Sequence, residues 1–181
     1  GKMLVHYETA QHDPCLLNTM TLLNPITPDS FKIAAPEGAT RVKATCMDTL
    51  PWIPITQPRE VELACVDGYV ACDVDQDVLY IAQVERYGKN GNVGKAFMGG
   101  FHMTSGAIAS SVGHDNHNII VMGTNFEDMS IAVNHLVEIG GGQCLVDGGE
   151  IIECVEYPLC GLLSDLSCEE LAAKKSALNA A

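Results

Sequence analysis

Residues 119–142, with the sequence IIVMGTNFEDMSIAVNHLVEIGGG, decide the fold. Ile119–Gly123 is a short run rich in β-branched residues, which is typical of a buried strand. Apolar residues recur at helical spacing over about Glu127–Ile139 and predict a helix with one apolar face. These residues are Met129, Ala132, Val133, Leu136 and Val137. Thr124 and Glu127 fit a capping box at the helix start, so the stretch predicts a strand followed by a helix.

The residues after this helix predict a hairpin and a second helix. Gly140–Gly142 ends the first helix, because glycine adopts the left-handed conformation that follows a helix end. Gln143–Asp147 and Glu150–Tyr157 form a predicted hairpin around Gly148-Gly149. The last helix begins after Ser167, with Glu170 as its capping-box partner, and runs towards the C-terminus.

The first half of the chain is rich in predicted strands. Asp67-Gly68 separates two of them and is a strong hairpin signal, because both central turn residues need a positive φ. The expected strands are Arg41–Met47, Glu60–Val66, Tyr69–Asp73 and Val78–Tyr87, and the small apolar run Ser105–Val112 follows. This order predicts an α+β fold: a strand-rich first half with hairpins, then strand, helix and hairpin, and a C-terminal helix.

Length and charge narrow the classes of protein. A chain of 181 residues with 47% apolar content suits one domain, or one domain with an appendage. The net charge of -13 repels phosphate backbones and anionic lipids, so we expect neither nucleic acid nor a membrane as partner. No apolar stretch has the length that spans a bilayer, and no signal-peptide pattern is present.

The eight cysteines contain no C-x-x-C pair, the spacing that zinc sites usually use. Several lie in apolar runs, such as Cys65 and Cys144. We therefore expect buried free thiols in a reducing cytosol, which places the protein in the cytoplasm.

The glycine-rich stretch from Gly88 to Gly100 does not fit a phosphate-binding loop. Five residues separate Gly88 from Gly94 where that loop has four, and Ala96 stands where a magnesium-binding hydroxyl is needed. The stretch predicts a mobile or tightly folded turn after a strand. Arg86, just before it, could pair with an acidic group.

The segment His114-Asp115-Asn116-His117-Asn118 gathers two imidazoles, a carboxylate and two amides between two apolar runs. The histidines could face one point and bind a metal, hold a heterocycle or shuttle protons. Asp115 could orient one imidazole, and Asn118 has the donor and acceptor that suit a purine edge. A self-satisfied turn remains the alternative, because Asp and Asn often bond their own backbone. Two strong ligands are too few for a closed metal site.

The remaining histidines and two serines are weaker candidates for a functional site. His6, His12 and His135 suit surface or capping roles. His102 is of more interest, because it lies just before Ser105–Val112. Ser110 and Ser111 lack the G-x-S-x-G context of a serine nucleophile.

Residues 106–125, GAIASSVGHDNHNIIVMGTN, closely resemble the signature of the C-terminal domain of bacterial adenine deaminases. Residues 85–94 and 158–164 resemble flanking stretches of the same family, and the match extends over about residues 40–175. Gly113 and Asn116 depart from the family pattern, in which a bulkier small residue and a serine are usual. Both replacements are small, so the turn should survive.

The resemblance implies part of an amidohydrolase that hydrolyses adenine to hypoxanthine and ammonia. The reaction would use water activated by a metal pair, manganese or iron, in a TIM-like barrel. This chain has no His-x-His pair, the usual first metal signature of such barrels, so we expect the barrel to be absent from it. The expected partners are adenine, the barrel portion and further copies of the enzyme.

Both ends of the chain fit this interpretation. Gly1-Lys2-Met3-Leu4 resembles the tail of the small β domain that follows such barrels, and Ala181 stops inside a helix. We therefore expect a chain cut at both ends, or one piece of a split enzyme. Residues 1–30 would be an irregular segment from that upstream domain, and residues 31–181 the C-terminal domain.

The resemblance gives the candidate residues two sets of roles. His114, Asp115 and His117 would complete the active site, while Asn118, Ser110 and Ser111 would contact the substrate. We expect no metal ligand in this chain and no deaminase activity from the chain alone. The alternative is a structural or oligomerisation module without catalytic residues.

Overall fold

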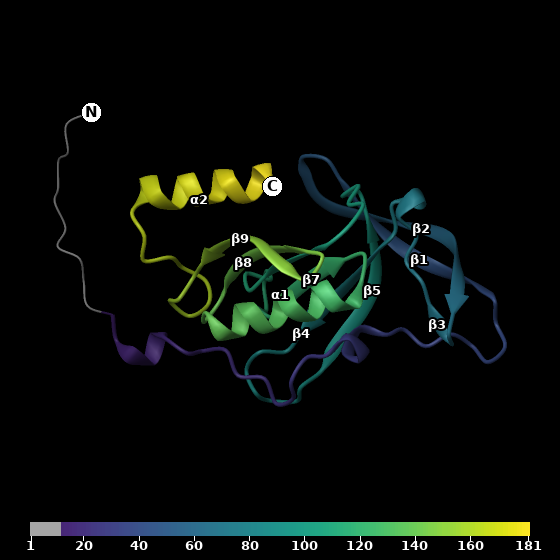
Figure 1. Cartoon of the computed structure of the whole chain (residues 1–181), viewed down its shortest axis with the longest axis horizontal. Coiled ribbons are helices and arrows are strands. Elements are labelled where there is room, and N and C mark those ends of the chain that lie inside the picture. Colours follow the sequence, from purple (N-terminus) through teal and green to yellow (C-terminus); the bar gives the residue numbers. More distant parts are fainter. Residues whose placement is uncertain (1–11) are drawn as a thin grey trace.

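A computed structural model describes residues 12–181 and contains a nine-stranded sheet with two α helices (Figure 1). The strand order is β3-β2-β1-β5-β4-β7-β6-β8-β9. The predicted α+β fold with hairpins and a C-terminal helix is confirmed. The strands are β1 Arg41–Leu50, β2 Ile53–Val66, β3 Tyr69–Val70, β4 Leu79–Val84, β5 Val93–Gly99, β6 Ala107–Ser110, β7 Ile119–Gly123, β8 Gly142–Asp147 and β9 Glu150–Glu156, and the helices are α1 Phe126–Glu138 and α2 Cys168–Ala180.

Both predicted hairpin turns are present. Asp67-Gly68 joins β2 to β3, and both residues have a positive φ, 51° and 82°. Gly148-Gly149 joins β8 to β9, again with positive φ at both residues. The strand expected over Tyr69–Asp73 is only two residues long.

The structure differs from the sequence prediction in the glycine-rich stretch. The expected turn covers only its first part, because Val93–Gly99 forms β5 between β1 and β4. β5 is antiparallel to β4, the strand just before it, and parallel to β1, which lies about fifty residues earlier with Cys46 opposite Phe97. Local glycine content therefore hid a strand that pairing with β4 and with the distant β1 stabilises.

The prediction of a Thr124 cap on α1 is wrong. Asn125 is the N-cap, and its side-chain oxygen accepts the backbone N–H of Asp128 at 2.8 Å. Thr124 instead donates its own backbone N–H to the Gly106 carbonyl at 2.9 Å, which joins β7 to the start of β6. The Ser167–Glu170 capping box of α2 is confirmed.

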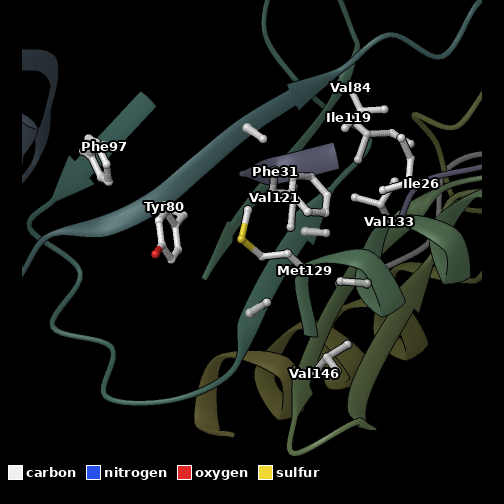
Figure 2. Packing of buried hydrophobic residues seen from close by; sticks show 14 of the residues in the cluster. Ile26, Phe31, Tyr80, Val84, Phe97, Ile119, Val121, Met129, Val133 and Val146 are labelled. Atoms are coloured by element: carbon white, nitrogen blue, oxygen red, sulfur yellow. The ribbon is translucent and has the colours of Figure 1, made fainter. Parts of the chain in front are cut away.

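The main core lies between the sheet and α1. The helix contributes Met129, Ala132, Val133 and Leu136, all fully buried, against β6, β7 and β8. Phe31, from a short 3-10 helix at Pro28–Phe31, fills the centre of this core beside Val121 and Met129 (Figure 2).

The second helix packs on the opposite side of the sheet. Leu178 of α2 packs with Val155 and Tyr157 in a small separate cluster. In Figure 1, β8 and β9 lie between α1 and α2. Within residues 12–181 no helix has the length and apolar character needed to span a membrane.

The eight cysteines are free thiols. Cys46 and Cys144 are buried, whereas Cys15 and Cys168 are exposed, so the expectation of buried thiols holds for only part of the set. Burial raises the pKa of Cys144 to about 12 and, together with a hydrogen bond to Asp48, the pKa of Cys46 to about 11.

The expected upstream segment is described only in part. Residues 12–30 contain a short 3-10 helix at Pro14–Leu16, and Thr21 forms an isolated bridge to Tyr87. Gly1-Lys2-Met3-Leu4 and His6 lie outside the described residues. The division into residues 1–30 and 31–181 stays a prediction.

Candidate functional site

The segment from Gly113 to Asn118 links β6 to β7, and its backbone is anchored by Arg86. The Arg86 side chain is only 1% exposed. Its Nε donates to the His117 carbonyl, and its Nη2 donates to the Cys160 carbonyl at 3.0 Å. A buried guanidinium needs such acceptors, because an unpaired charge in a core is strongly destabilising. The loop is therefore tied to the turn that follows β9.

The expected acidic partner of Arg86 is absent from residues 12–181. Its guanidinium also contacts the Thr19 hydroxyl at 3.5 Å and the Met20 sulfur at 3.1 Å, and it lies 5.1 Å from the centre of the Tyr87 ring. Gly161 leaves the space that the guanidinium occupies, since a Cβ there would lie 2.5 Å from Nη1. Arg86 thus joins three segments that are distant in sequence.

Two further side chains hold Asn116 in place. The Tyr87 hydroxyl donates to the Asn116 carbonyl at 2.8 Å. Gln83 Nε2 donates to Asn116 Oδ1 at 3.1 Å, and the backbone N–H of Asn118 donates to the same oxygen at 2.9 Å. The shape of the turn is therefore fixed by bonds from Gln83 and Tyr87 and by the bond between Asn118 and Asn116 within the turn.

His114 and Asp115 project from this fixed base into solvent. Their side chains are 89% and 85% exposed. His114 Nδ1 lies 2.6 Å from Asp115 Oδ1, so the carboxylate orients the imidazole. The structure therefore brings these two predicted residues together at an accessible tip.

His117 and Asn118 lie deeper. Both are half-buried, and His117 has a left-handed φ of 55°. Asn118 Oδ1 is a buried acceptor without a donor, and it is the one such side-chain atom found within residues 12–181. A buried oxygen without a hydrogen-bond donor lowers the free energy of unfolding by about 1–3 kcal/mol, so a group that donates to Asn118 Oδ1 would stabilise the loop.

The two serines have different surroundings. Ser110 is half-buried, and its hydroxyl accepts the backbone N–H of Val112 at 3.1 Å. Ser111 is fully buried, and its hydroxyl donates to the Gly161 carbonyl at 2.5 Å and accepts the Gly142 N–H at 2.8 Å. Ser111 therefore joins β6, β8 and the Cys160–Gly161 turn, and no ligand can reach its hydroxyl without opening the core.

Glu85 shapes the turn on the other side of Arg86. Its carboxylate accepts backbone N–H groups from four residues at 2.6–3.2 Å, namely Tyr87, Lys89, Asn90 and Gly91. Burial acts to raise the pKa of Glu85, but these four donors outweigh it and hold the pKa below its ordinary value. The glycine-rich turn is thus folded around a carboxylate and leaves no cradle for a phosphate.

The described residues do not fit a metal centre. In the stretch from residue 12 to 181, no three His, Cys, Asp or Glu side chains gather closely enough to hold an ion. His102 lies away from the loop, with Nδ1 3.3 Å from Asp77 Oδ2. His135 lies near the end of α1, on the face of the sheet that carries the main core.

The positioning role of three residues was not predicted from the sequence, in which Arg86 was only a candidate to pair with an acidic group. Gln83, Arg86 and Tyr87 lie at or just beyond the end of β4, which pairs with β7. The alternation of β4 places Gln83 on a partly apolar face, which was a usable signal. Arg86 had no comparable signal, because two of its acceptors are backbone carbonyls and the other two belong to the distant residues Thr19 and Met20.

Comparison with known proteins identifies a family. A sequence model described as "Adenine deaminase C-terminal domain" matches residues 54–181. Proteins named adenine deaminase from Moorella thermoacetica and Mesorhizobium japonicum are 36% and 39% identical over the whole chain. One from Clostridium botulinum strain Langeland is 40% identical over 91% of it. The chain spans only 27–30% of the length of these relatives.

The first prediction concerns the Arg86 anchor. Arg86→Met should lower the free energy of unfolding by about 3 kcal/mol, because buried carbonyls lose charged donors. Arg41→Met is the matched control, since Arg41 pairs with Glu62 at an exposed site and should cost less than about 1 kcal/mol. Urea unfolding measures both. Equal losses in the two variants would contradict the anchoring role of Arg86.

The second prediction concerns Glu85. A lowered folded-state pKa contributes stability above the ordinary Glu pKa of about 4.3, and this contribution is lost as the pH falls through the folded-state value. Glu85→Gln should therefore lower Tm at pH 7, and the difference from the unmodified chain should close in acid. Glu37→Gln, at an exposed turn position, is the control. A Tm difference independent of pH would show that the charge of Glu85 is unimportant.

Proposed function

Because the chain belongs to the adenine deaminase family, as its C-terminal domain, we propose that it forms part of an enzyme that hydrolyses adenine to hypoxanthine and ammonia. The structure of the loop Gly113–Asn118 is the observation that supports a role for this chain in the active site. Its base is fixed by Arg86 and Tyr87, while His114 and Asp115 stand exposed at its tip. A preorganised loop with free titratable groups suits the completion of a site built largely elsewhere.

The metal pair belongs, in this proposal, to a barrel outside this chain. The residues described supply no ligand set for it. A manganese or iron pair would lower the pKa of water so that hydroxide exists near neutral pH. Homo-oligomer formation and a cytoplasmic location are further parts of the proposal.

Within that enzyme the residues of this chain have distinct roles. His114, held by Asp115, and His117 would hold or move a proton near the purine. Asn118 stays a candidate contact for the edge of the purine, and its buried Oδ1 would have to become accessible before it could accept a hydrogen bond there. Ser110 stays a candidate contact for the substrate. Ser111 is left out of these contacts, because its hydroxyl is committed within the core.

The alternative function is a structural or oligomerisation module. The internal bond from the Asn118 N–H to Asn116 Oδ1 favours it, because it is the kind of bond that a self-satisfied turn makes. The exposure of His114 and Asp115 argues against it, since their side chains stabilise little where they stand.

The third prediction tests the two functions. In a chimera, this chain replaces the matched 30% of the Moorella thermoacetica adenine deaminase. His114→Ala and His117→Ala should each lower kcat/KM for adenine about 10²-fold or more, the usual contribution of a group that transfers a proton. The control is His135→Ala, which should leave the rate unchanged. His135 lies in the last turn of α1 and is not part of the loop Gly113–Asn118.

The structural alternative predicts a different pattern for the same variants. The rate and metal content would stay normal, while Tm or oligomer size would change. Steady-state kinetics, metal analysis and size-exclusion chromatography on each variant separate the two functions.

The fourth prediction concerns the chain alone. We expect ammonia release from adenine at the level of the blank, with manganese or iron added, because residues 12–181 offer no metal-binding cluster. Turnover well above the blank would contradict the assignment of the metal pair to another part of the enzyme.

A further inference from the structure

One face of the sheet is left uncovered in its middle. Side chains alternate along a strand, so residues next to the buried core positions point to the opposite face. On β4, β5, β6 and β7 these outward residues are largely apolar. Together with the adjoining Phe101 they form what we call the open face: Ile81, Met98, Phe101, Ile108, Ile120 and Met122, which line one hollow of about 270 Å³.

The two helices leave the centre of this area free, and only the end of α2 borders it, near Phe101 and Ile108. The first helix packs on the other side of the sheet, against β6, β7 and β8. The second helix shares a side with the open face but packs on β9, through Leu178 and Val155. Phe101 is consequently 46% exposed and Ile108 36% exposed. Exposed apolar patches of this kind are typical of interaction surfaces.

The charge pattern of the open face differs from that of the whole chain. The chain carries a net charge of -13. The hollow of the open face and an adjoining hollow of about 280 Å³ are lined by no Asp or Glu in the described structure, and by one cation, Lys95. Asp147 lines a third hollow, which Phe101 and Ile108 share with the end of α2, so the depletion of charge is confined to the first two hollows. Depletion of charge is characteristic of the buried centre of protein interfaces.

The open face is continuous with the loop Gly113–Asn118. Ile120, which lines both hollows, lies two residues after the loop. Gln83 lines the adjoining hollow, and its amide holds Asn116 at 3.1 Å. A body that covers the open face therefore also meets the edge from which His114 and Asp115 project.

We propose that the open face is the docking surface for the remaining portion of the adenine deaminase, and this inference rests on the function proposed above. The relatives are more than three times as long as the matched region, so a large body lies beside this domain in each of them. The surface of that body against the open face is uncharged and apolar. Docking there sets the direction in which the His114–Asp115 tip points.

The test is thiol protection in the chimera described above. Ile108→Cys should react with a maleimide about tenfold more slowly in the chimera than in the chain alone, because the centre of an interface excludes solvent. Ile55→Cys, on β2, is the matched control, since Ile55 is 59% exposed and outside both hollows. Peptide mapping separates these sites from the exposed Cys15 and Cys168.

Each outcome is decisive. Equal reaction of Cys at position 108 in the chimera and in the chain alone would overturn the proposal. So would slow reaction in the chain alone accompanied by dimer formation, since a second copy would then occupy the open face. Protection is measured without turnover, so a normal rate in His114→Ala would refute the catalytic role of the loop and leave the docking result standing.

A second measurement covers a chimera that does not fold. Hydroxyl-radical footprinting of the unmodified Moorella thermoacetica enzyme compares the positions aligned with Ile81, Ile108 and Ile120 with the position aligned with Ile55. The first three should be protected. Oxidation of those three side chains at the rate expected for exposed residues would overturn the proposal.

Discussion

The buried guanidinium of Arg86 is the contact on which the arrangement of the site depends. It lies at the meeting point of three segments: the loop through His117, the turn at Cys160, and the early segment at Thr19 and Met20. A charge at this depth is tolerated because its donors point at backbone and side-chain acceptors. Its removal would leave the His117 carbonyl without its guanidinium donor and would weaken the contact between the segments, which the backbone bond from the Cys160 N–H to the Leu16 carbonyl at 2.7 Å would then hold only in part.

Residues next to Arg86 also hold turns in place through hydrogen bonds. The Glu85 carboxylate accepts four backbone N–H groups and closes the glycine-rich turn. The neighbouring Arg86 holds the loop Gly113–Asn118, so each of the two adjacent charged residues fixes a different loop. Gln83 and Tyr87 then fix Asn116. One short stretch at the end of β4 thus positions the loop at Asn116 and His117, while the side chains of His114 and Asp115 remain exposed.

The sequence allowed much of the fold to be predicted, because its signals are local. The apolar spacing of α1 and the Asp67-Gly68 and Gly148-Gly149 turns each depend on neighbouring residues, and each appears in the structure. β5 was missed because its stability comes from pairing with β1 and β4, which glycine-rich composition does not reveal. The Thr124 cap was wrong by one residue, because Thr124 bonds across to Gly106 instead.

The candidate site was predictable in its chemistry and not in its support. His114, Asp115 and His117 stand out as residue types between two strands, and the first two do lie together. The role of Arg86 could not be assigned, since its acceptors lie up to 74 residues away and include backbone carbonyls, which carry no side-chain signature. The burial of Ser111 was equally hidden, because it depends on Gly161 and Gly142 approaching from distant parts of the chain.

The central claim, that Arg86 positions the loop for chemistry on adenine, is tested most directly by a double-mutant cycle in the chimera. kcat/KM is measured for Arg86→Lys, for His117→Ala and for both together, each under conditions where the protein is folded. Coupled residues give strongly non-additive losses. The account predicts that the double variant loses little more than the worse single variant. Losses that simply multiply would show that the two residues act independently and would contradict it.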